Sequence, residues 1–254
     1  MPASDSLTIK PRLLCKRNNY EIYGKVTKTS YIIANTNIVP IKLLQKLYNT
    51  FPESIIVFEQ ECFKVMRCEF ILNASCCIKI INDYKIFQKQ STSNNILLVD
   101  DELNDLCIKY KTVFIILTSN LEIHDNNLWK CQILLKSRWP ITKLKVAVST
   151  PDYEDIASSI LQIVGFVTCI ISDRENDCKG IINLDCTGSI DELILIELGL
   201  NNFQVKNVLR EFKSAYDFIN CSKSTKLRIL DGNLAQVDSL CKLLSSDFPQ
   251  VRAL

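Results

Sequence analysis

Hydrophobic and polar positions change their spacing along the chain, and each change predicts a different secondary-structure element. Short apolar runs typical of buried strands recur in the first two thirds of the sequence, at residues 30–34, 54–58, 112–117 and 144–148. Two further runs, 68–72 and 76–81, flank Asn73-Ala74-Ser75, and this spacing predicts a β-hairpin. Segments with helical periodicity separate the strands, so the pattern predicts an α/β domain with a largely parallel sheet.

The helices expected between these strands each carry one apolar face at helical spacing. They cover residues 38–48, 126–138 and 152–164, and Ser149-Thr150-Pro151-Asp152 is a capping-type start for the last one. Residues 96–99 are ambiguous, because they fit either a strand or the start of a helix that runs through Leu103, Leu106 and Cys107. The sequence leaves both interpretations open.

The alternation of strands and helices stops at residues 171–189, where charged residues without periodicity and two glycines predict a linker. Beyond it the pattern is helical, with short connections between the helices. The expected helices are 190–197, 203–212, 215–220, 223–230 and 234–245. We therefore expect an α/β domain at 29–170 and an all-helical domain at 190–248, preceded by an arm at 1–28.

Composition narrows the class of protein. The chain has 254 residues, 47% hydrophobic and 23% charged, which is enough to bury a core in each domain. No apolar run approaches the roughly 20 residues that cross a bilayer, and the first ten residues lack the apolar stretch of a secretory signal. The arm carries six Lys or Arg against two Asp or Glu, which fits either a solvated tail or a contact with a polyanion. We expect a soluble intracellular protein that spans no membrane.

The cysteines and the histidine limit the chemistry. The 12 Cys lie mainly in apolar segments, with neither C-x2-C nor C-x4-C spacing, so we expect buried thiols such as Cys107 rather than disulfides or a zinc site. The one histidine, His124, lies in a polar stretch typical of a solvated loop, which argues against a Ser-His-Asp or Cys-His mechanism. The glycine-rich phosphate-binding motifs are absent from the sequence, so it predicts no bound nucleotide. Together with the cysteine and histidine pattern, this predicts neither a metal ion nor another cofactor.

The helical region contains an internal repeat of helix, tight turn and helix, centred on Gly199 and Gly232. Glycine permits a tight turn, after which the amides at the start of the next helix are able to face a phosphate. The repeat resembles the tandem helix-hairpin-helix module of DNA-repair proteins, which contacts DNA backbones without reading bases. This resemblance predicts DNA contacts at Gly199, Asn201, Asn202, Lys206, Gly232 and Asn233.

A second interpretation of the repeat is a small helical bundle whose glycines only end helices. Eight Lys or Arg balance eight Asp or Glu over residues 189–254, whereas nonspecific DNA binders usually carry a basic face. The first turn also differs from the module, because Glu197-Leu198-Gly199-Leu200-Asn201 replaces Ile-Pro-Gly-Val-Gly and a second glycine is lost. We therefore expect the second turn to contribute more to DNA contact than the first.

An α/β domain followed by such a module resembles the XPF-type nuclease superfamily, whose nuclease domain has a restriction-endonuclease-like fold. Active members carry Asp-Tyr on one hairpin strand, Glu-Arg-Lys on the next and then an Asp, and these carboxylates hold the metal ion for DNA cleavage. In the matching hairpin Lys79, Ile80 and Ile81 stand at the Glu-Arg-Lys positions, and Lys85 stands at the Asp position. These side chains offer no oxygen ligand, so the resemblance implies a pseudonuclease rather than an enzyme.

Inactive members of this superfamily act as partners in heterodimers, and the chain resembles the Fanconi anaemia core-complex-associated type, which pairs with a Fanconi M translocase. The similar segments are 31–35, 70–78 and 153–164. The resemblance implies a nuclear, noncatalytic DNA-binding subunit that targets a larger XPF-family subunit, a Fanconi M-type translocase, to damaged or branched DNA. Two alternatives stay open: a meiotic XPF-like pseudonuclease partner acting on recombination intermediates, and a pure protein-interaction scaffold without nucleic-acid affinity.

The end of the last expected helix contains a candidate partner contact. Leu240, Leu243 and Leu244 form an apolar stripe, and Phe248 follows just before Pro249, which ends helices. A noncatalytic subunit of the XPF superfamily carries a Phe at this offset that anchors in its partner. The resemblance therefore predicts partner contacts at Leu240, Leu244 and Phe248, with folding of Phe248 onto its own bundle as the alternative.

Overall fold

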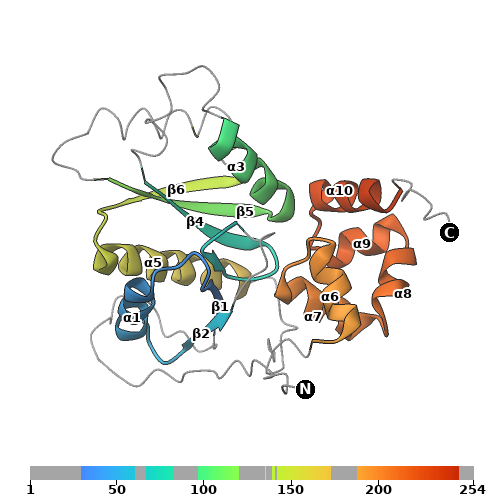
Figure 1. Cartoon of the computed structure of the whole chain (residues 1–254), viewed down its shortest axis with the longest axis horizontal. Helices are drawn as coiled ribbons and strands as arrows, with labels where there is room; N and C mark the ends of the chain where they lie inside the picture. The colour runs from blue at the N-terminus through green and yellow to red at the C-terminus, as the bar shows by residue number, and fades with distance from the viewer. Residues whose placement is uncertain are drawn as a thin grey trace, which may run out of the picture.

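Figure 1 shows the computed structural model of the chain, in which an α/β domain lies beside a smaller domain built of helices. The structure describes residues 30–60, 67–82, 97–119, 135, 139, 140, 142–172 and 188–245. The predicted arm, most of the predicted linker and nearly all of the predicted helix at 126–138 lie outside these residues. Lys85, His124 and Phe248 also lie outside them.

A mixed sheet forms the centre of the α/β domain, and its order within the described residues is β2-β1-β3-β4-β5-β6. The strands are β1 (Ser30–Asn35), β2 (Ile55–Gln60), β3 (Phe70–Ile71), β4 (Cys76–Asn82), β5 (Thr112–Thr118) and β6 (Leu144–Ser149). β1 runs parallel to β2, and β4, β5 and β6 form a second parallel set. β3 lies between the two sets and joins them, because it pairs with both β1 and β4, in the antiparallel direction in each case. The predicted strands and the predicted hairpin are therefore confirmed.

Helices cover both faces of this sheet. α1 (Ile41–Thr50) and α5 (Tyr153–Ser172) pack together on one face, and α3 (Leu97–Lys109) lies on the other (Figure 1). Side chains alternate along β5, so Phe114 joins the core under α1 and α5 while its neighbour Ile115 joins the core under α3. A strand that is apolar on both faces is typical of a parallel sheet covered on both sides.

The ambiguous segment of the sequence is a helix, because α3 begins at Leu97. Leu103, Leu106 and Cys107 are all buried in the core that α3 shares with the sheet. Their spacing of three and four residues places them on one side of a helix, whereas a strand would separate them onto two faces. This shared burial decides between the two interpretations.

The cysteines for which the structure describes a side chain are free thiols. Cys107 is buried as expected, and burial raises the pKa of the Cys76 and Cys107 thiols to about 11. Both therefore stay protonated at neutral pH, where only a thiolate is a good nucleophile or metal ligand. These two thiols have structural rather than reactive surroundings.

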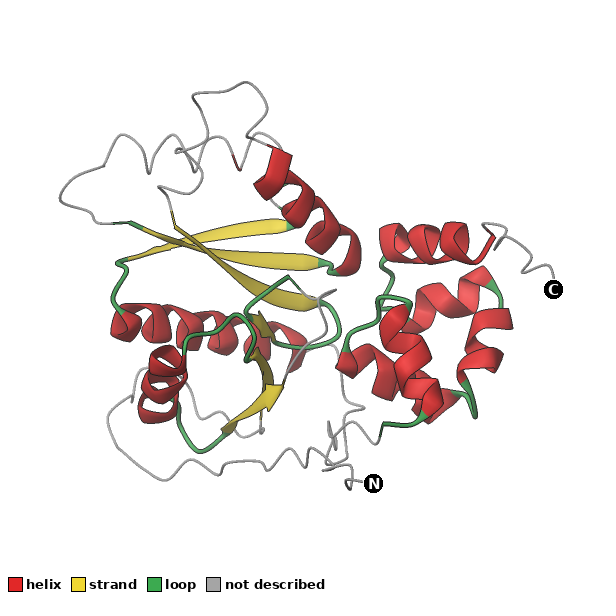
Figure 2. Ribbon diagram, in the orientation of Figure 1, coloured by secondary structure: helices red, strands yellow, loops and turns green. Residues whose placement is uncertain are grey.

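The helices of the second domain surround a core of their own. They are α6 (Ile190–Glu197), α7 (Asn202–Glu211), α8 (Ala215–Asn220), α9 (Lys223–Ile229) and α10 (Leu234–Ser245). Ser189, Asn201, Ser214 and Ser222 each cap a helix by accepting a hydrogen bond from the amide three residues later. The loops of this domain, green in Figure 2, include two that face the α/β domain. No helix in the described part of the chain has both the length and the apolar character needed to cross a membrane.

Candidate functional site

Two tight turns join the helices of the repeat, and both use the left-handed backbone that glycine favours. Gly199 has a φ of 88° between α6 and α7, and Gly232 has a φ of 72° between α9 and α10. The Leu200 N–H donates to the Leu195 carbonyl at 3.1 Å, and the Gly232 N–H donates to the Leu227 carbonyl at 2.8 Å. Each hydrogen bond reaches back five residues and closes the end of a helix. The repeat in the sequence is thus present as two helical hairpins with similar turns.

A pair of glutamines joins the two hairpins at the starts of their second helices. Gln204 Nε2 donates to Gln236 Oε1 at 3.0 Å, and Gln236 Nε2 donates back to Gln204 Oε1 at 3.0 Å. Each glutamine lies three residues after an asparagine, Asn201 or Asn233, whose side-chain oxygen accepts from the glutamine's backbone N–H. The two hairpins therefore repeat the same capping arrangement, and the amide pair holds the starts of α7 and α10 side by side.

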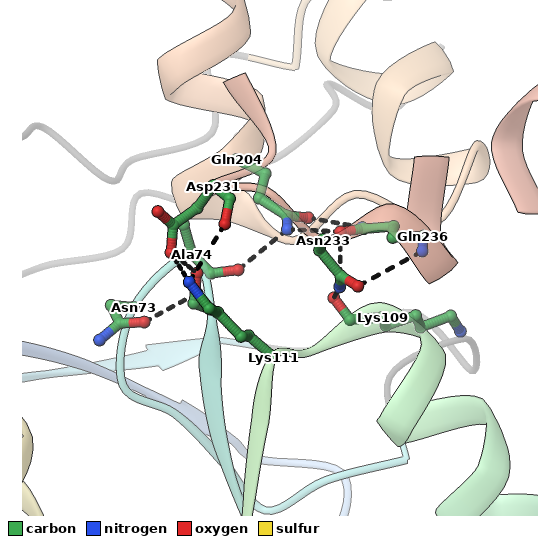
Figure 3. Close-up of polar contacts among 9 residues, drawn as sticks. Asn73, Ala74, Lys109, Lys111, Gln204, Asp231, Asn233 and Gln236 are labelled. Carbon is green, nitrogen blue, oxygen red and sulfur yellow. Dashed lines mark hydrogen bonds and ion pairs between the residues drawn. The ribbon is translucent and has the colours of Figure 1, made fainter. Parts of the chain in front are cut away.

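The same two asparagines bind the α/β domain. Asn201 Nδ2 donates to the Ala74 carbonyl at 3.1 Å, and Gln204 Nε2 donates to that same carbonyl at 2.9 Å. Asn233 Nδ2 donates to the carbonyls of Ile108 and Lys109 at 2.9 Å and 3.1 Å. Figure 3 shows how the turn of the β3–β4 hairpin and the end of α3 meet the two helical hairpins. Both predicted DNA-binding turns thus lie against the α/β domain.

Further contacts extend this interdomain surface on either side. Asn202 Nδ2 donates to Gln60 Oε1 at 2.7 Å, at the end of β2. Asp231 accepts from Ser75 Oγ at 2.6 Å, and its carboxylate lies 3.7 Å from the Lys111 ammonium (Figure 3). Phe203 is the residue of the helical domain that joins the core between the sheet and α3.

The two glycines of the predicted set have different surroundings. A Cβ placed on Gly199 would lie 3.7 Å from Lys109 Cε, so the first turn lies close to the end of α3. A Cβ placed on Gly232 would meet no atom within 4 Å. The second turn therefore keeps an open side.

The strand that matches the nuclease motif carries a buried ion pair. Lys79 Nζ lies 3.6 Å from Glu69 Oε1 and 3.5 Å from Glu102 Oε2, and it donates to the Arg67 carbonyl at 2.7 Å. The second oxygen of Glu69 accepts from the Ile80 N–H at 2.8 Å. The Lys79 ammonium on β4 thus pairs with the carboxylate of Glu69, the residue directly before β3.

The residues of this strand do not fit a divalent metal ion. Ile81 is buried in the core, and burial raises the pKa of Glu69 above the usual value even though Lys79 lowers it. Within the described residues, no group of three or more His, Cys, Asp or Glu is arranged to hold a metal. Magnesium needs oxygen ligands, whereas Lys79 supplies a competing positive charge at this position. Lys85, the fourth position of the motif, lies outside the described residues.

Comparison with known families places the α/β domain. A family model described as the ZIP2 middle domain matches residues 24–162, which is more than half of the chain. The chain belongs to the ZIP2 middle-domain family. The match ends within α5, so the helical hairpins of this ZIP2-family chain lie beyond the matched residues. The Fanconi-associated assignment, the narrower part of the sequence prediction, is not confirmed by this match.

Solved structures similar to this ZIP2-family chain include two of XPF from Aeropyrum pernix. The first is 13% identical with a TM-score of 0.42, and the match covers 86% of this chain and 99% of that chain. The second, XPF in complex with DNA, is 14% identical with a TM-score of 0.35, and the match covers 86% of this chain and 100% of that chain. A search of curated proteins found no match.

Lys206, predicted to add a phosphate contact, binds a carboxylate of its own domain instead. Its ammonium lies 2.6 Å from Glu192 Oε1, and the Glu192 side chain is almost fully buried. The other oxygen of Glu192 accepts from the Gly188 N–H at 3.0 Å. Drawing Lys206 toward DNA would leave a buried carboxylate without its cation, which is unfavourable. Its DNA contact stays a prediction, and this arrangement opposes it.

Two of the three predicted partner contacts, Leu240 and Leu244, face the core of their own domain. Leu240 is buried in the core of the helical domain, and Leu244 packs against that core, so both side chains are engaged within their own domain. The helical spacing that suggested an external stripe is equally the spacing of a core-facing stripe. Leu243, between them, is exposed. Partner contact at Phe248 stays a prediction, because that residue lies outside the described part of the chain.

Sequence analysis missed the two glutamines that join the hairpins. Gln204 and Gln236 are polar residues on helices, and such residues are usually solvated, but both are buried here. The signal that predicts them is the repeated pattern of Asn followed three residues later by Gln, one or two residues after each turn glycine. Asn with Gln three residues later is a capping-box variant, and its duplication marks an equivalent site in each hairpin.

Proposed function

We propose that this chain is a noncatalytic, DNA-binding subunit of a heterodimer that acts in DNA recombination or repair. The observation that carries the proposal is the duplicated hairpin. Each copy leads through a left-handed glycine turn into a helix start, and the Gln204–Gln236 pair holds the two starts next to each other. Two adjacent helix N-termini offer two backbone-binding positions, which suits the two strands of a DNA duplex.

The biological setting that we propose is the meiotic one. The ZIP2 family match favours the meiotic XPF-like alternative over targeting of a Fanconi M-type translocase. In this setting the DNA is a branched recombination intermediate, the partner is a larger XPF-family subunit and the protein acts in the nucleus. Affinity purification of the full chain from dividing and meiotic cells tests this setting: a large XPF-like partner recovered from meiotic cells supports it. Recovery of a Fanconi-type translocase from dividing cells contradicts it.

The noncatalytic part of the proposal rests on the hairpin strand. Lys79 donates to the Arg67 carbonyl and neutralises Glu69, and Ile81 faces the core, so the strand presents no set of oxygen ligands. We expect flap, fork and single-stranded DNA to stay intact when incubated with the purified chain in Mg²⁺ or Mn²⁺. Cleavage that persists through purification and disappears in the Lys79→Ala variant contradicts this part of the proposal.

A protein-interaction scaffold without DNA affinity is the second candidate function. It is favoured by the side-chain amides of Asn201, Asn202 and Asn233, which already donate to the α/β domain. A neutral helical region also fits a scaffold, because it provides no basic surface for DNA.

A binding titration over a range of salt concentrations separates the two candidates. Fluorescent four-way junction, fork and single-stranded DNA are titrated with the full chain. A DNA-binding subunit gives an affinity that falls as salt rises, because each neutralised phosphate contributes about −0.9 to the slope of log K against log salt on duplex DNA. We expect a shallow negative slope and little sequence preference, since backbone amides rather than lysines make the contacts. Absence of binding to every substrate at low salt supports the scaffold.

A further inference from the structure

Three of the residues predicted to contact DNA are almost inaccessible in this structure, whereas Gly232 is exposed. Asn201 and Asn202 each expose 3% of their surface and Asn233 exposes 6%, although all three stand at helix starts. The α/β domain covers them through the turn of the β3–β4 hairpin, the end of β2 and the end of α3. A DNA phosphate cannot reach these positions while the two domains keep this contact.

The α/β domain presents acceptors in the place where phosphate oxygens would bind. The carbonyls of Ile108 and Lys109 belong to the last turn of α3, where helix carbonyls lack partners within their own helix. They accept from Asn233, directly before the first turn of α10, so the negative end of one helix dipole meets the positive end of another. Ala74 provides the equivalent carbonyl for the first hairpin. These carbonyls accept from side-chain amides at the two helix starts, and the α/β domain thereby occupies the place that a nucleic-acid backbone would need.

This interdomain contact is mainly polar, which makes it separable. Its hydrogen bonds are replaced by hydrogen bonds to water when the domains part, so each contributes only modestly to closure. The side chains of Lys111 and Asp231 are about half exposed, at 49% and 53%, and an exposed ion pair contributes little to the free energy of domain closure. Phe203 is the apolar anchor, and interfaces of this kind between domains commonly permit relative motion.

We propose that the α/β domain closes the DNA-binding face of the helical hairpins, and that DNA binds after the helical domain separates from it. The inference rests on the proposed DNA-binding function and adds its regulation. The DNA backbone and the α/β-domain segments that carry the Ala74, Ile108 and Lys109 carbonyls compete for the same two helix starts. The closed form therefore has low DNA affinity. A ligand that binds the α/β side of the contact separates the domains and raises the DNA affinity of the chain.

The first test weakens the closed contact from the α/β side. Lys111→Glu places a carboxylate beside Asp231 without altering either hairpin turn, so the domains repel each other there. We expect the full-length variant to bind fork DNA about threefold to tenfold more tightly than wild type, although it has lost a positive charge. Lys42→Glu, on the exposed face of α1, makes the same charge change away from the contact and is expected to leave affinity unchanged or slightly lower.

The second test locks the contact. The Ser75 hydroxyl and the Asp231 carboxylate lie 2.6 Å apart, so Ser75→Cys with Asp231→Cys places two thiols near each other, and mild oxidation is used to join them. We expect the oxidised double variant to bind fork DNA at least about tenfold more weakly than the same protein after reduction. Each single-cysteine variant, oxidised in parallel, controls for the native thiols, and a thermal melt confirms folding.

The outcomes separate failure of closure from failure of DNA binding. Equal affinity of the oxidised and reduced double variant overturns the closure and leaves DNA binding intact. Lack of DNA binding by wild type, Lys111→Glu and the reduced double variant alike overturns the proposed function itself.

Discussion

Glu69 shows at the scale of a single residue how the chain accommodates a buried charge. Glu69 lies directly before β3, and the Lys79 ammonium reaches its carboxylate from β4 at 3.6 Å. Burial disfavours the charged form more than the lysine favours it, so the pKa of Glu69 lies above the usual value. Lys79 thus has a structural role as the partner of a buried carboxylate, which the sequence alone did not indicate.

The raised pKa of Glu69 predicts how stability depends on pH. A carboxyl group with a raised folded pKa stabilises the fold fully below its unfolded pKa of about 4.3, and that contribution is lost as pH rises through the folded pKa. Glu69→Gln removes this titration. The measured quantity is the unfolding free energy of wild type minus that of Glu69→Gln. We expect this difference to fall as pH rises from 4 to 8.

Urea unfolding at several pH values measures this difference. Glu53→Gln removes an exposed carboxylate near β2 and is the matched control. A wild-type minus Glu69→Gln difference that rises with pH would show that the lysine outweighs burial at this carboxylate.

At the scale of elements, local signals predicted most of the helices and strands. α6, α8 and α10 begin and end where the sequence placed them, because Ser caps and the turn glycine mark their boundaries locally. α5 runs to Ser172, beyond the predicted end at 164, since the segment stays apolar and Gly165 does not interrupt it. The run at 96–99 lacked periodicity, and only packing of α3 on the sheet decided its structure.

The link between the two hairpins predicts a strong coupling between Gln204 and Gln236. Replacing one glutamine with leucine removes both hydrogen bonds of the pair from the other buried amide, although Gln204 still donates to the Ala74 carbonyl, and each buried polar group left unsatisfied costs about 1–3 kcal/mol. Replacing both removes the two polar groups together, so the double variant is expected to be less destabilised than the sum of the single variants. A double-mutant cycle from chemical unfolding measures this coupling. Additive losses would show that each glutamine acts separately.

At the scale of the whole molecule, the arrangement of the two domains could not be predicted from the sequence. The DNA-contact prediction for Asn201 and Asn233 came from their position after a turn glycine, and such a local pattern carries no information about a domain docked on top. The polar contacts that cover them join residues more than 120 positions apart in the chain. The fold of each domain follows from its own periodicity, whereas the state of the candidate site depends on how the domains pack.

Substitution of Gly232, compared with Gly188, tests most directly whether the hairpin turns bind DNA. Both glycines have a left-handed φ, 72° and 69°, and neither has an atom within 4 Å of a Cβ placed on it, so a change to valine strains both backbones alike. Of these two glycines, only Gly232 lies in a hairpin turn. In titrations of fork DNA with the full chain, we expect Gly232→Val to bind about tenfold more weakly, a loss of about 1.4 kcal/mol, and Gly188→Val to bind within about twofold of wild type. Wild-type affinity in a folded Gly232→Val protein, or an equal loss in Gly188→Val, would contradict DNA binding through the hairpins.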